Sequence, residues 1–262
     1  TPIEVIEETA TATPEPTNTA TPEPKPTNTP TPSPTPLPGS VTLPNVVNVP
    51  QAFNNCGPAN LSIVLAFHGD DTTQTDAAAY LKPNQYDRNV SPWQINDYVN
   101  DQTPLASTAR SGGTLEHLKH FIAEGYPVVV ERGADFNDGE GWYGHYLTVF
   151  GFDDTTQTFL AMDTYGEYGG WSPDGISVSY DELWTTWKDF NYTFYVVYPE
   201  VEKPQVDAIL GVNLADEVTM WQYTADRARE HIVVNPDDKF AWFNLGTSLT
   251  ELGWLTGEAT YY

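Results

Sequence analysis

Half of the prolines in this 262-residue chain fall within its first 40 residues, and this distribution decides which part of the chain can fold. Residues 1–40 hold 11 of the 22 prolines and 11 threonines, and they contain no aromatic residue. The motif Pro14–Thr19 returns in nearly the same form at Pro24–Thr29. Such a segment cannot bury apolar area, so we expect a disordered linker with semi-rigid, polyproline-like character. The core must therefore come from residues 41–262.

Charge and apolar content exclude several classes of protein. The 36 acidic residues outweigh the 11 basic ones and give a net charge of −25, which disfavours nucleic acids and anionic membranes as partners. No apolar run approaches the ~20 residues that span a bilayer, so we expect no membrane insertion. Residues 1–10 do not resemble a signal peptide, and the chain does not begin with Met, so we expect a processed or truncated piece of a longer protein. With Cys56 as its one cysteine, the chain cannot form an internal disulfide.

Residues 41–200 carry the signals of an α+β domain. The segment 57–67 is apolar on nearly every face, which is typical of a buried helix. The other predicted elements are helices at 114–124 and 180–187 and strands at 127–130, 146–152, 158–162 and 193–198. Because the strands cluster after the first helices, we expect an antiparallel sheet.

Residues 201–262 change character and read as helical. Helices are predicted at 225–234 and 240–252, separated by a turn that begins at Asn235-Pro236. The spacing of Trp242, Leu245 and Gly246 after this turn resembles a tetratricopeptide repeat (TPR). Stacked repeats need about three units for stability, and fewer than two are present. We therefore expect this segment to pack on the preceding domain or to continue beyond Tyr262.

Cys56 lies where a nucleophilic thiol would be placed. Pro58 favours the start of the buried helix, so the thiol falls at or just before the helix N-terminus. Free backbone amides and the helix dipole favour the thiolate there, and the thiolate is the reactive form. The alternative is a small buried apolar side chain without chemistry, which is the usual role of an isolated cysteine.

A predicted hairpin brings a base and a carboxylate together. If the strands fold about Asp154, Leu147 faces Ala161 and His145 faces Asp163. Side chains alternate across a sheet, so His145 and Asp163 would share a face with these apolar residues, and we expect that face to pack on the Cys56 helix. An imidazole beside a carboxylate is the usual partner of a nucleophilic cysteine. The alternatives are a fortuitous surface pair and a register slip of one residue, which would separate the two groups.

Four sequence blocks occur in an order that matches a known family. They are Gln51 with Cys56–Leu61, then Thr114–Glu116, then Gly125–Val128, then Gly144–Val149 followed by Asp163. Over about residues 45–200 the chain resembles the C39-like peptidase domain, a group of the papain-like cysteine peptidases. The resemblance implies a papain-like fold in which a buried N-terminal helix packs on an antiparallel sheet.

The resemblance also implies roles for individual residues. Cys56 would be the nucleophile, His145 the base, Asp163 the orienting carboxylate and Gln51 an oxyanion donor. Gln51 lies five residues before Cys56 where six are expected, so Asn54 or Asn55 is an alternative donor.

Further candidates line the expected cleft or fail to form a metal site. Trp142 and Tyr143 precede His145 and are predicted, with Asn55, to contact the substrate. His117 and His120 lie three residues apart on a predicted helix, but with no third ligand nearby we expect a solvated face and no metal.

We therefore expect an enzyme, an exported cysteine peptidase that acts on a peptide or protein and needs no cofactor. The Thr/Pro segment resembles spacers that tether exported domains to bacterial surfaces, which favours an extracellular or surface-attached bacterial protein. One alternative is an acyltransferase or transpeptidase that uses the same triad. The other is a catalytically inert binding module whose TPR-like segment recruits a protein partner.

Overall fold

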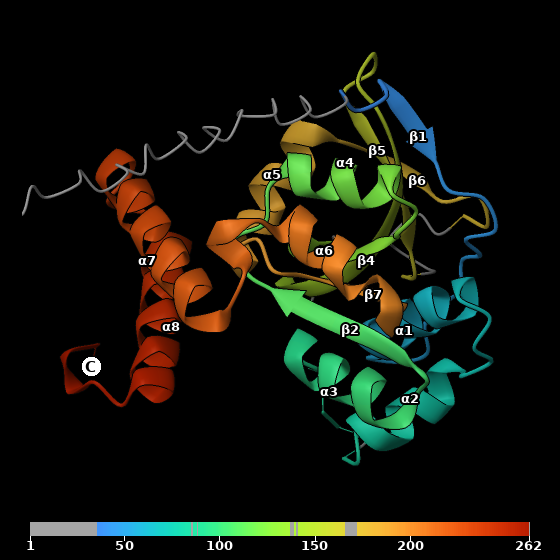
Figure 1. Ribbon diagram of the computed structural model, residues 1–262, viewed down its shortest axis with the longest axis horizontal. Helices are drawn as coiled ribbons and strands as arrows, with labels where there is room; N and C mark the ends of the chain where they lie inside the picture. The colour runs from blue at the N-terminus through green and yellow to red at the C-terminus, as the bar shows by residue number, and fades with distance from the viewer. Residues whose placement is uncertain are drawn as a thin grey trace, which may run out of the picture. The chain divides into compact units, whose positions relative to one another are not determined.

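A computed structural model describes residues 36–84, 86–87, 89–136, 139, 141–165 and 172–261, so residues 1–35 of the predicted linker lie outside the described part. The described residues form one seven-stranded sheet in which every strand pair is antiparallel (Figure 1). The strand order is β2-β7-β3-β4-β5-β6, and β1 pairs with β4 outside this path. The strands are β1 (Ser40–Thr42), β2 (Leu105–Arg110), β3 (Val128–Asp135), β4 (Trp142–Asp153), β5 (Thr158–Asp163), β6 (Ile176–Ser179) and β7 (Phe194–Pro199).

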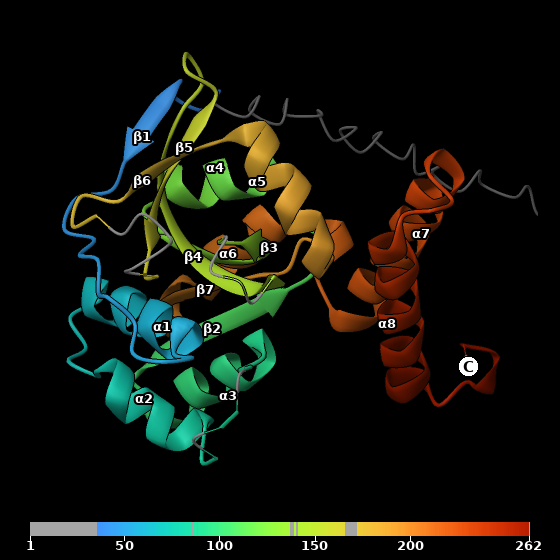
Figure 2. The ribbon, with the colours of Figure 1, turned by 180° about the vertical axis from the view of Figure 1, so that it is seen from behind.

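Helices cover both faces of this sheet (Figures 1 and 2). On one face lie α1 (Cys56–Phe67), α2 (Gln74–Leu81) and α3 (Pro92–Gln102), and on the other lie α4 (Leu115–Ala123), α5 (Tyr180–Trp187) and α6 (Lys203–Leu210). The strand alternation explains why β3 is apolar throughout: Val129 packs with α1–α3, whereas Val128 and Val130 pack with α4–α6. The predicted α+β class with an antiparallel sheet is confirmed.

Two of the predicted helices begin where their sequence signals place them. The buried helix is α1, which starts at Cys56 and ends at Phe67. In α4, Thr114 is the N-cap: its hydroxyl accepts from the backbone N–H of His117, and Nδ1 of His117 accepts from the Thr114 N–H. His117 therefore caps the helix, and its ring stacks on Phe194 instead of lying on the predicted solvated face, whereas His120 is exposed. The elements α2, α3 and β2 had no counterpart in the sequence analysis.

The prediction that the Leu147 face of the hairpin packs on the Cys56 helix is wrong. Leu147 and Val149 belong to the cluster that contains Phe121 of α4 and Leu183 of α5. From α1, Ile63 reaches this cluster, while the apolar side chains Leu61, Val64 and Leu65 pack on the opposite face of the sheet. Most apolar side chains of the helix therefore lie on the face opposite Leu147, and Ile63 is the buried apolar residue of α1 that reaches the Leu147 cluster.

The C-terminal segment is a helical hairpin that packs on the sheet domain. Packing on the preceding domain was one of the two alternatives expected from the sequence. It consists of α7 (Glu217–Val234) and α8 (Lys239–Thr256). Nδ2 of Asn244 donates to the Lys188 carbonyl at 2.8 Å, and the Arg227 guanidinium lies 3.6 Å from the centre of the Tyr192 ring. Among the described residues, none of the helices combines the length and apolar character needed to span a bilayer.

Candidate active site

Cys56 is the first residue of α1 and is partly exposed. The next nine residues of this helix, Gly57–Leu65, are buried, so its position is fixed by the core. Asn55 is the N-cap residue but makes no side-chain capping bond, which leaves amide groups of the first turn without a side-chain acceptor. A thiol at this point lies at the positive end of the helix dipole, as the sequence predicted.

His145 and Asp163 form a buried hydrogen-bonded pair. Nε2 of His145 lies 2.8 Å from Oδ1 of Asp163, and because a carboxylate only accepts, Nε2 is the donor. Both side chains are 1% exposed. Oδ1 of Asp163 also accepts from the backbone N–H of Tyr165 at 2.9 Å, so the carboxylate is held from two sides. The sequence-based pairing of these two residues in space is what the structure shows.

The register that produces this pair differs from the predicted one. Asp163 lies opposite Leu147, not opposite His145, so the imidazole and the carboxylate are diagonal neighbours. Near the turn, Gly151 pairs with Leu160 and Phe152 with Phe159, and the register then shifts by one between Val149 and Gly151. The predicted pairing of Leu147 with Ala161 is therefore wrong.

A β-bulge at Phe150 causes this shift and makes the active site possible. If the register at the turn continued without the bulge, Asp163 would face Thr148, and the alternation of side chains would put His145 on the opposite face. The extra residue in β4 moves His145 to the other side of the sheet relative to this register, so that His145 and Asp163 lie on the same face. The same bulge is used elsewhere: the Phe150 carbonyl accepts from the backbone N–H of Leu43 at 2.9 Å.

The His145 ring interacts with both Asp163 and Cys56. Burial alone would lower the pKa of His145, but hydrogen bonds and charge interactions with Asp163 and Cys56 outweigh it and raise the pKa to about 9. Because Nε2 is committed to Asp163, Nδ1 is the ring nitrogen left for the thiol. The imidazole is therefore cationic at neutral pH, and a cation beside a thiol favours the thiolate.

The open edge of β4 explains how α1 reaches His145. The last β5 residue, Asp163, pairs with Leu147, so the Tyr146 carbonyl lies just beyond the paired part of the strand. Nδ2 of Asn60, one turn after Cys56, donates to this carbonyl at 3.1 Å and to the Cys56 carbonyl at 2.9 Å. The N-terminal turn of α1 thus adjoins β4 where β5 ends.

Gln51 is held next to this turn by Thr164. The Gln51 backbone N–H donates to the Thr164 carbonyl, and its Oε1 accepts from the Thr164 hydroxyl, both at 2.8 Å. The Thr164 hydroxyl in turn accepts from Nδ2 of Asn60 at 3.3 Å. With its oxygen committed, Gln51 presents the Nε2 amide as its remaining donor group, which is what an oxyanion donor requires.

Asn55, predicted to contact the substrate, has its side chain committed to α2 and to the residue after it. Nδ2 of Asn55 donates to Oε1 of Gln74 at 3.1 Å, and its Oδ1 accepts from Nζ of Lys82 at 3.4 Å. The residue is 6% exposed. The structure thus gives Asn55 a bracing contact in the loop before Cys56 and leaves the substrate role a prediction.

The two residues predicted to line the cleft, Trp142 and Tyr143, lie on opposite faces of the sheet. The Trp142 indole stacks on Phe190 and packs on Phe240 of α8, and Nε1 donates to Asp189 at 3.1 Å. Trp142 therefore joins the sheet to the helical hairpin, on the face opposite His145. Tyr143 shares the His145 face, and its ring lies 5.5 Å from that of Phe136.

Residues that the sequence analysis missed surround the imidazole. The Phe136 ring meets the His145 ring edge-on at 5.0 Å and lies 4.6 Å from the Tyr165 ring. Arg132, opposite His145 on β3, is buried, and its Nη2 lies 3.9 Å from Oδ2 of Asp163. The motif signals did not mark these positions, because an arginine within a strand reads as a surface residue.

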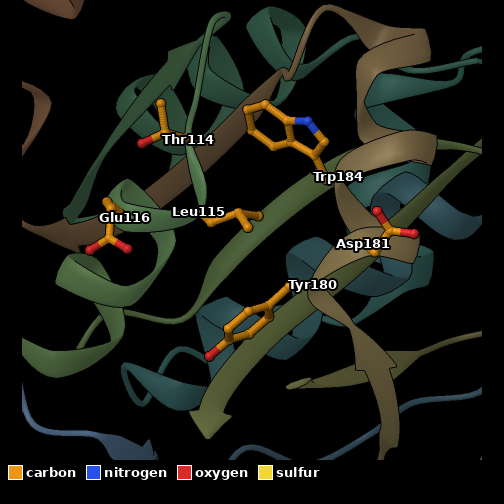
Figure 3. Close-up of a pocket in the computed structure, with 6 residues that line it drawn as sticks. All are labelled: Thr114, Leu115, Glu116, Tyr180, Asp181 and Trp184. Atoms are coloured by element: carbon orange, nitrogen blue, oxygen red, sulfur yellow. The ribbon is translucent and has the colours of Figure 1, made fainter. Parts of the chain in front are cut away.

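A groove between α4 and α5 has a volume of about 420 Å³ and is lined by Leu115, Tyr180 and Trp184 (Figure 3). It shares no residue with the triad and lies on the face of the sheet opposite α2 and α3. Within the described residues, no three His, Cys, Asp or Glu side chains gather as metal ligands.

The chain is similar to a known family and to several solved structures. Residues 43–195 match the model of the Peptidase_C39 like family. Among solved structures, a candidate C39-like peptidase from Bacillus anthracis is 16% identical with a TM-score of 0.47, covering 60% of this chain and 96% of that one. The peptidase domain of Streptococcus ComA is 15% identical with a TM-score of 0.45 (60% and 100% covered). Xylellain, a cysteine protease from Xylella fastidiosa, is 14% identical with a TM-score of 0.45 (62% and 86% covered).

A search of the curated proteins finds no match. The family model covers more than half of the chain and spans Cys56, His145 and Asp163. The chain therefore belongs to the C39-like peptidase family.

Proposed function

We propose that this chain hydrolyses peptide bonds through a Cys56–His145–Asp163 triad. The observation that carries the proposal is the buried His145–Asp163 pair, whose imidazole has Cys56 as its other partner. A cysteine nucleophile depends on an imidazole that is oriented by a carboxylate and lies next to the thiol, and the described geometry supplies this arrangement.

The reaction follows from the positions of these groups. The Cys56 thiolate attacks the carbonyl carbon of the scissile peptide, and the carbonyl oxygen becomes an oxyanion. The Cys56 backbone N–H and Nε2 of Gln51 are the donors for this oxyanion. Nδ1–H of His145 then protonates the leaving amine, the C–N bond breaks, and a thioester remains on Cys56.

Hydrolysis of the thioester regenerates the enzyme. Neutral His145 takes a proton from water, the hydroxide adds to the thioester carbon, and the C–S bond breaks to release the acid and the thiolate. Asp163 holds the imidazole in place throughout and stabilises its cationic form without taking the proton. No step needs a cofactor.

Digestion of a peptide library, read by mass spectrometry, tests this proposal. Wild-type protein should produce new termini, and Cys56→Ala and His145→Ala should produce none. His120→Ala is the matched control, because His120 is an exposed histidine on α4. Products that persist in Cys56→Ala, or their absence from wild-type digests, would contradict peptidase activity.

The same triad could transfer the acyl group to an amine instead of water. Adding an amine acceptor to the digest distinguishes these outcomes: a transpeptidase yields products that carry the acceptor mass, and a hydrolase yields free acids. A catalytically inert binding module would yield neither product.

We also propose that the protein acts outside the cell or attached to its surface, on the resemblance of residues 1–40 to bacterial spacers. Cell fractionation with an antibody to the folded domain tests this location. A protein partner for the TPR-like hairpin α7–α8 stays a prediction.

A further inference from the structure

A lysine contacts the loop that precedes the nucleophile. Lys82 follows the last residue of α2 and is only 9% exposed. Its Nζ donates to the backbone carbonyl of Asn54 and, at 3.4 Å, to Oδ1 of Asn55. These acceptors belong to the two residues immediately before Cys56.

The positive charge of Lys82 has no carboxylate partner. Among the described residues, no Asp or Glu oxygen lies within 4.0 Å of its Nζ. Burial lowers the pKa of Lys82, and the charges of Cys56 and Asp87 partly oppose that effect. Burying an ammonium without a carboxylate is unfavourable, so a purely structural contact with two neutral oxygens does not explain it. Of the two nearby anions, Cys56 has a larger effect on Lys82 than Asp87.

The loop that Lys82 holds sets the position of an oxyanion donor. Asn54 has a left-handed backbone with φ of 54°, and the Asn55 N–H closes the turn by donating to the Ala52 carbonyl at 3.1 Å. The next amide is that of Cys56, which the proposed mechanism assigns to the oxyanion. Displacing the Asn54 carbonyl would therefore reorient the peptide units that lead to this amide.

We propose that Lys82 is a positioning residue for the Cys56 centre: it fixes the turn that aims the Cys56 amide and supplies a second cation beside the thiolate. This inference rests on the proposed peptidase function. The two cations have different roles. His145 transfers the proton during the reaction, whereas Lys82 stays protonated throughout.

The remaining charged and titratable groups around Cys56 do not duplicate this role. From β4 come His145, backed by Asp163, and Tyr146, which lies beside Glu131 of β3. From β7 comes Tyr195. Burial raises the pKa of both tyrosines well above their ordinary value, so both are neutral at neutral pH. Lys82 and His145 are thus the cations that interact with Cys56 among these groups.

Three substitutions test the proposal in the full chain. Lys82→Met removes the charge and the donors while keeping an unbranched side chain, and Lys82→Arg keeps both. Lys119→Met is the matched control. Lys119 lies in α4, its side chain is 11% exposed, and its Nζ forms an ion pair with Asp154 at 2.7 Å. The readouts are the rate of Cys56 alkylation by iodoacetamide from pH 5 to 9, the kcat and KM for a cleaved peptide, and the melting temperature.

We expect Lys82→Met to slow alkylation at pH 6 about tenfold, because the thiolate loses the positive charge that is held at the two residues before Cys56. The rate should recover at higher pH, and kcat should fall about tenfold with KM little changed. Lys82→Arg should retain most of both rates, and Lys119→Met should match wild type. A uniform loss at every pH, not rescued by arginine, would show a merely structural role and overturn the proposal.

Two further outcomes are separable. If wild type alkylates rapidly at pH 6 and folded Lys82→Met does the same, Lys82 has no such role, although the peptidase proposal stands. If wild type shows neither rapid alkylation nor turnover, the peptidase function fails and this inference fails with it. Should Lys82→Met not fold, Lys82→Gln, which keeps an amide donor but no charge, should show the same pH shift; a wild-type profile for it refutes the charge effect.

Discussion

Replacing Asn60 with leucine removes the side chain that joins α1, β4 and the residue after β5. Asn60 is fully buried, and its Nδ2 donates to the carbonyls of Cys56 and Tyr146 and to the Thr164 hydroxyl. Its Oδ1 accepts from the Thr148 hydroxyl at 2.7 Å. Leucine is similar in volume, so the loss comes from the hydrogen bonds and not from a cavity.

The magnitude follows from which partners lose their only contact. The Cys56 carbonyl keeps its helical hydrogen bond, and the Thr164 hydroxyl keeps Gln51. The Thr148 hydroxyl and the Tyr146 carbonyl are left buried without a hydrogen-bond partner. Each such group costs about 1–3 kcal/mol of folding free energy. Added burial of leucine offsets part of this cost, so we expect a loss of about 3 kcal/mol in the free energy of unfolding, or roughly 6–12 °C in melting temperature.

Urea unfolding followed by tryptophan fluorescence measures this loss. The matched control is Asn100→Leu, because Asn100 is an exposed helical asparagine that bonds to Ser107. We expect the control to lose less than about 1 kcal/mol. Thr148→Val in the Asn60→Leu background should cost little more, since the shared bond is already gone. Equal losses for Asn60→Leu and Asn100→Leu would refute the reasoning.

Three further predictions concern the triad. The pKa of His145 is raised to about 9 from an ordinary 6.5, because hydrogen bonds to Asp163 and Cys56 outweigh its burial; the stability it confers is therefore complete below ~6.5 and lost as pH rises through about 9. Urea midpoints should fall over that range in wild type and fall less in His145→Gln. Asp163→Asn should retain more turnover than Asp163→Ala, because an amide oxygen still accepts from Nε2, while Cys56→Ala should have none; equal losses for Asp163→Asn and Cys56→Ala would contradict an orienting role. Arg132→Met removes the second cation beside the buried Asp163, which keeps its hydrogen bond to His145, and should cost about 1–3 kcal/mol in urea unfolding, against no change if the 3.9 Å contact is incidental.

The sequence predicted the parts of the site that depend on local signals. Pro58 and the apolar run after it located the N-terminus of α1, and Thr114 located that of α4. Capping boxes at Thr73–Asp76 and Ser91–Gln94 mark the starts of α2 and α3 in the same way. These two helices could therefore have been found from the sequence, although they were not.

The hairpin register could not be found in this way. Phe150 is apolar like its neighbours, so no residue type marks the bulge, and the turn alone would set a parity that separates His145 from Asp163. The predicted pair was nevertheless correct. Asp163 pairs with Leu147 instead of His145, and a shift of two residues leaves its side chain on the same face of the sheet as His145.

Two buried charged residues were also missed in the sequence analysis. Lys82 and Arg132 lie in segments whose composition suggests a solvent-facing role, and only the fold shows that one approaches the Cys56 loop and the other Asp163. Their importance comes from contacts between residues far apart in the chain, which periodicity and spacing do not report.

The most direct test of the triad is the pH dependence of Cys56 alkylation by iodoacetamide in wild type and His145→Ala, with the modified site identified by mass spectrometry. Because the chain has a single cysteine, every alkylated molecule reports on Cys56. Rapid alkylation at pH 6, where an ordinary thiol is almost wholly protonated, and a clear slowing in folded His145→Ala are expected. A rate that rises only above about pH 8 and is the same in both proteins would contradict a thiolate–imidazolium pair.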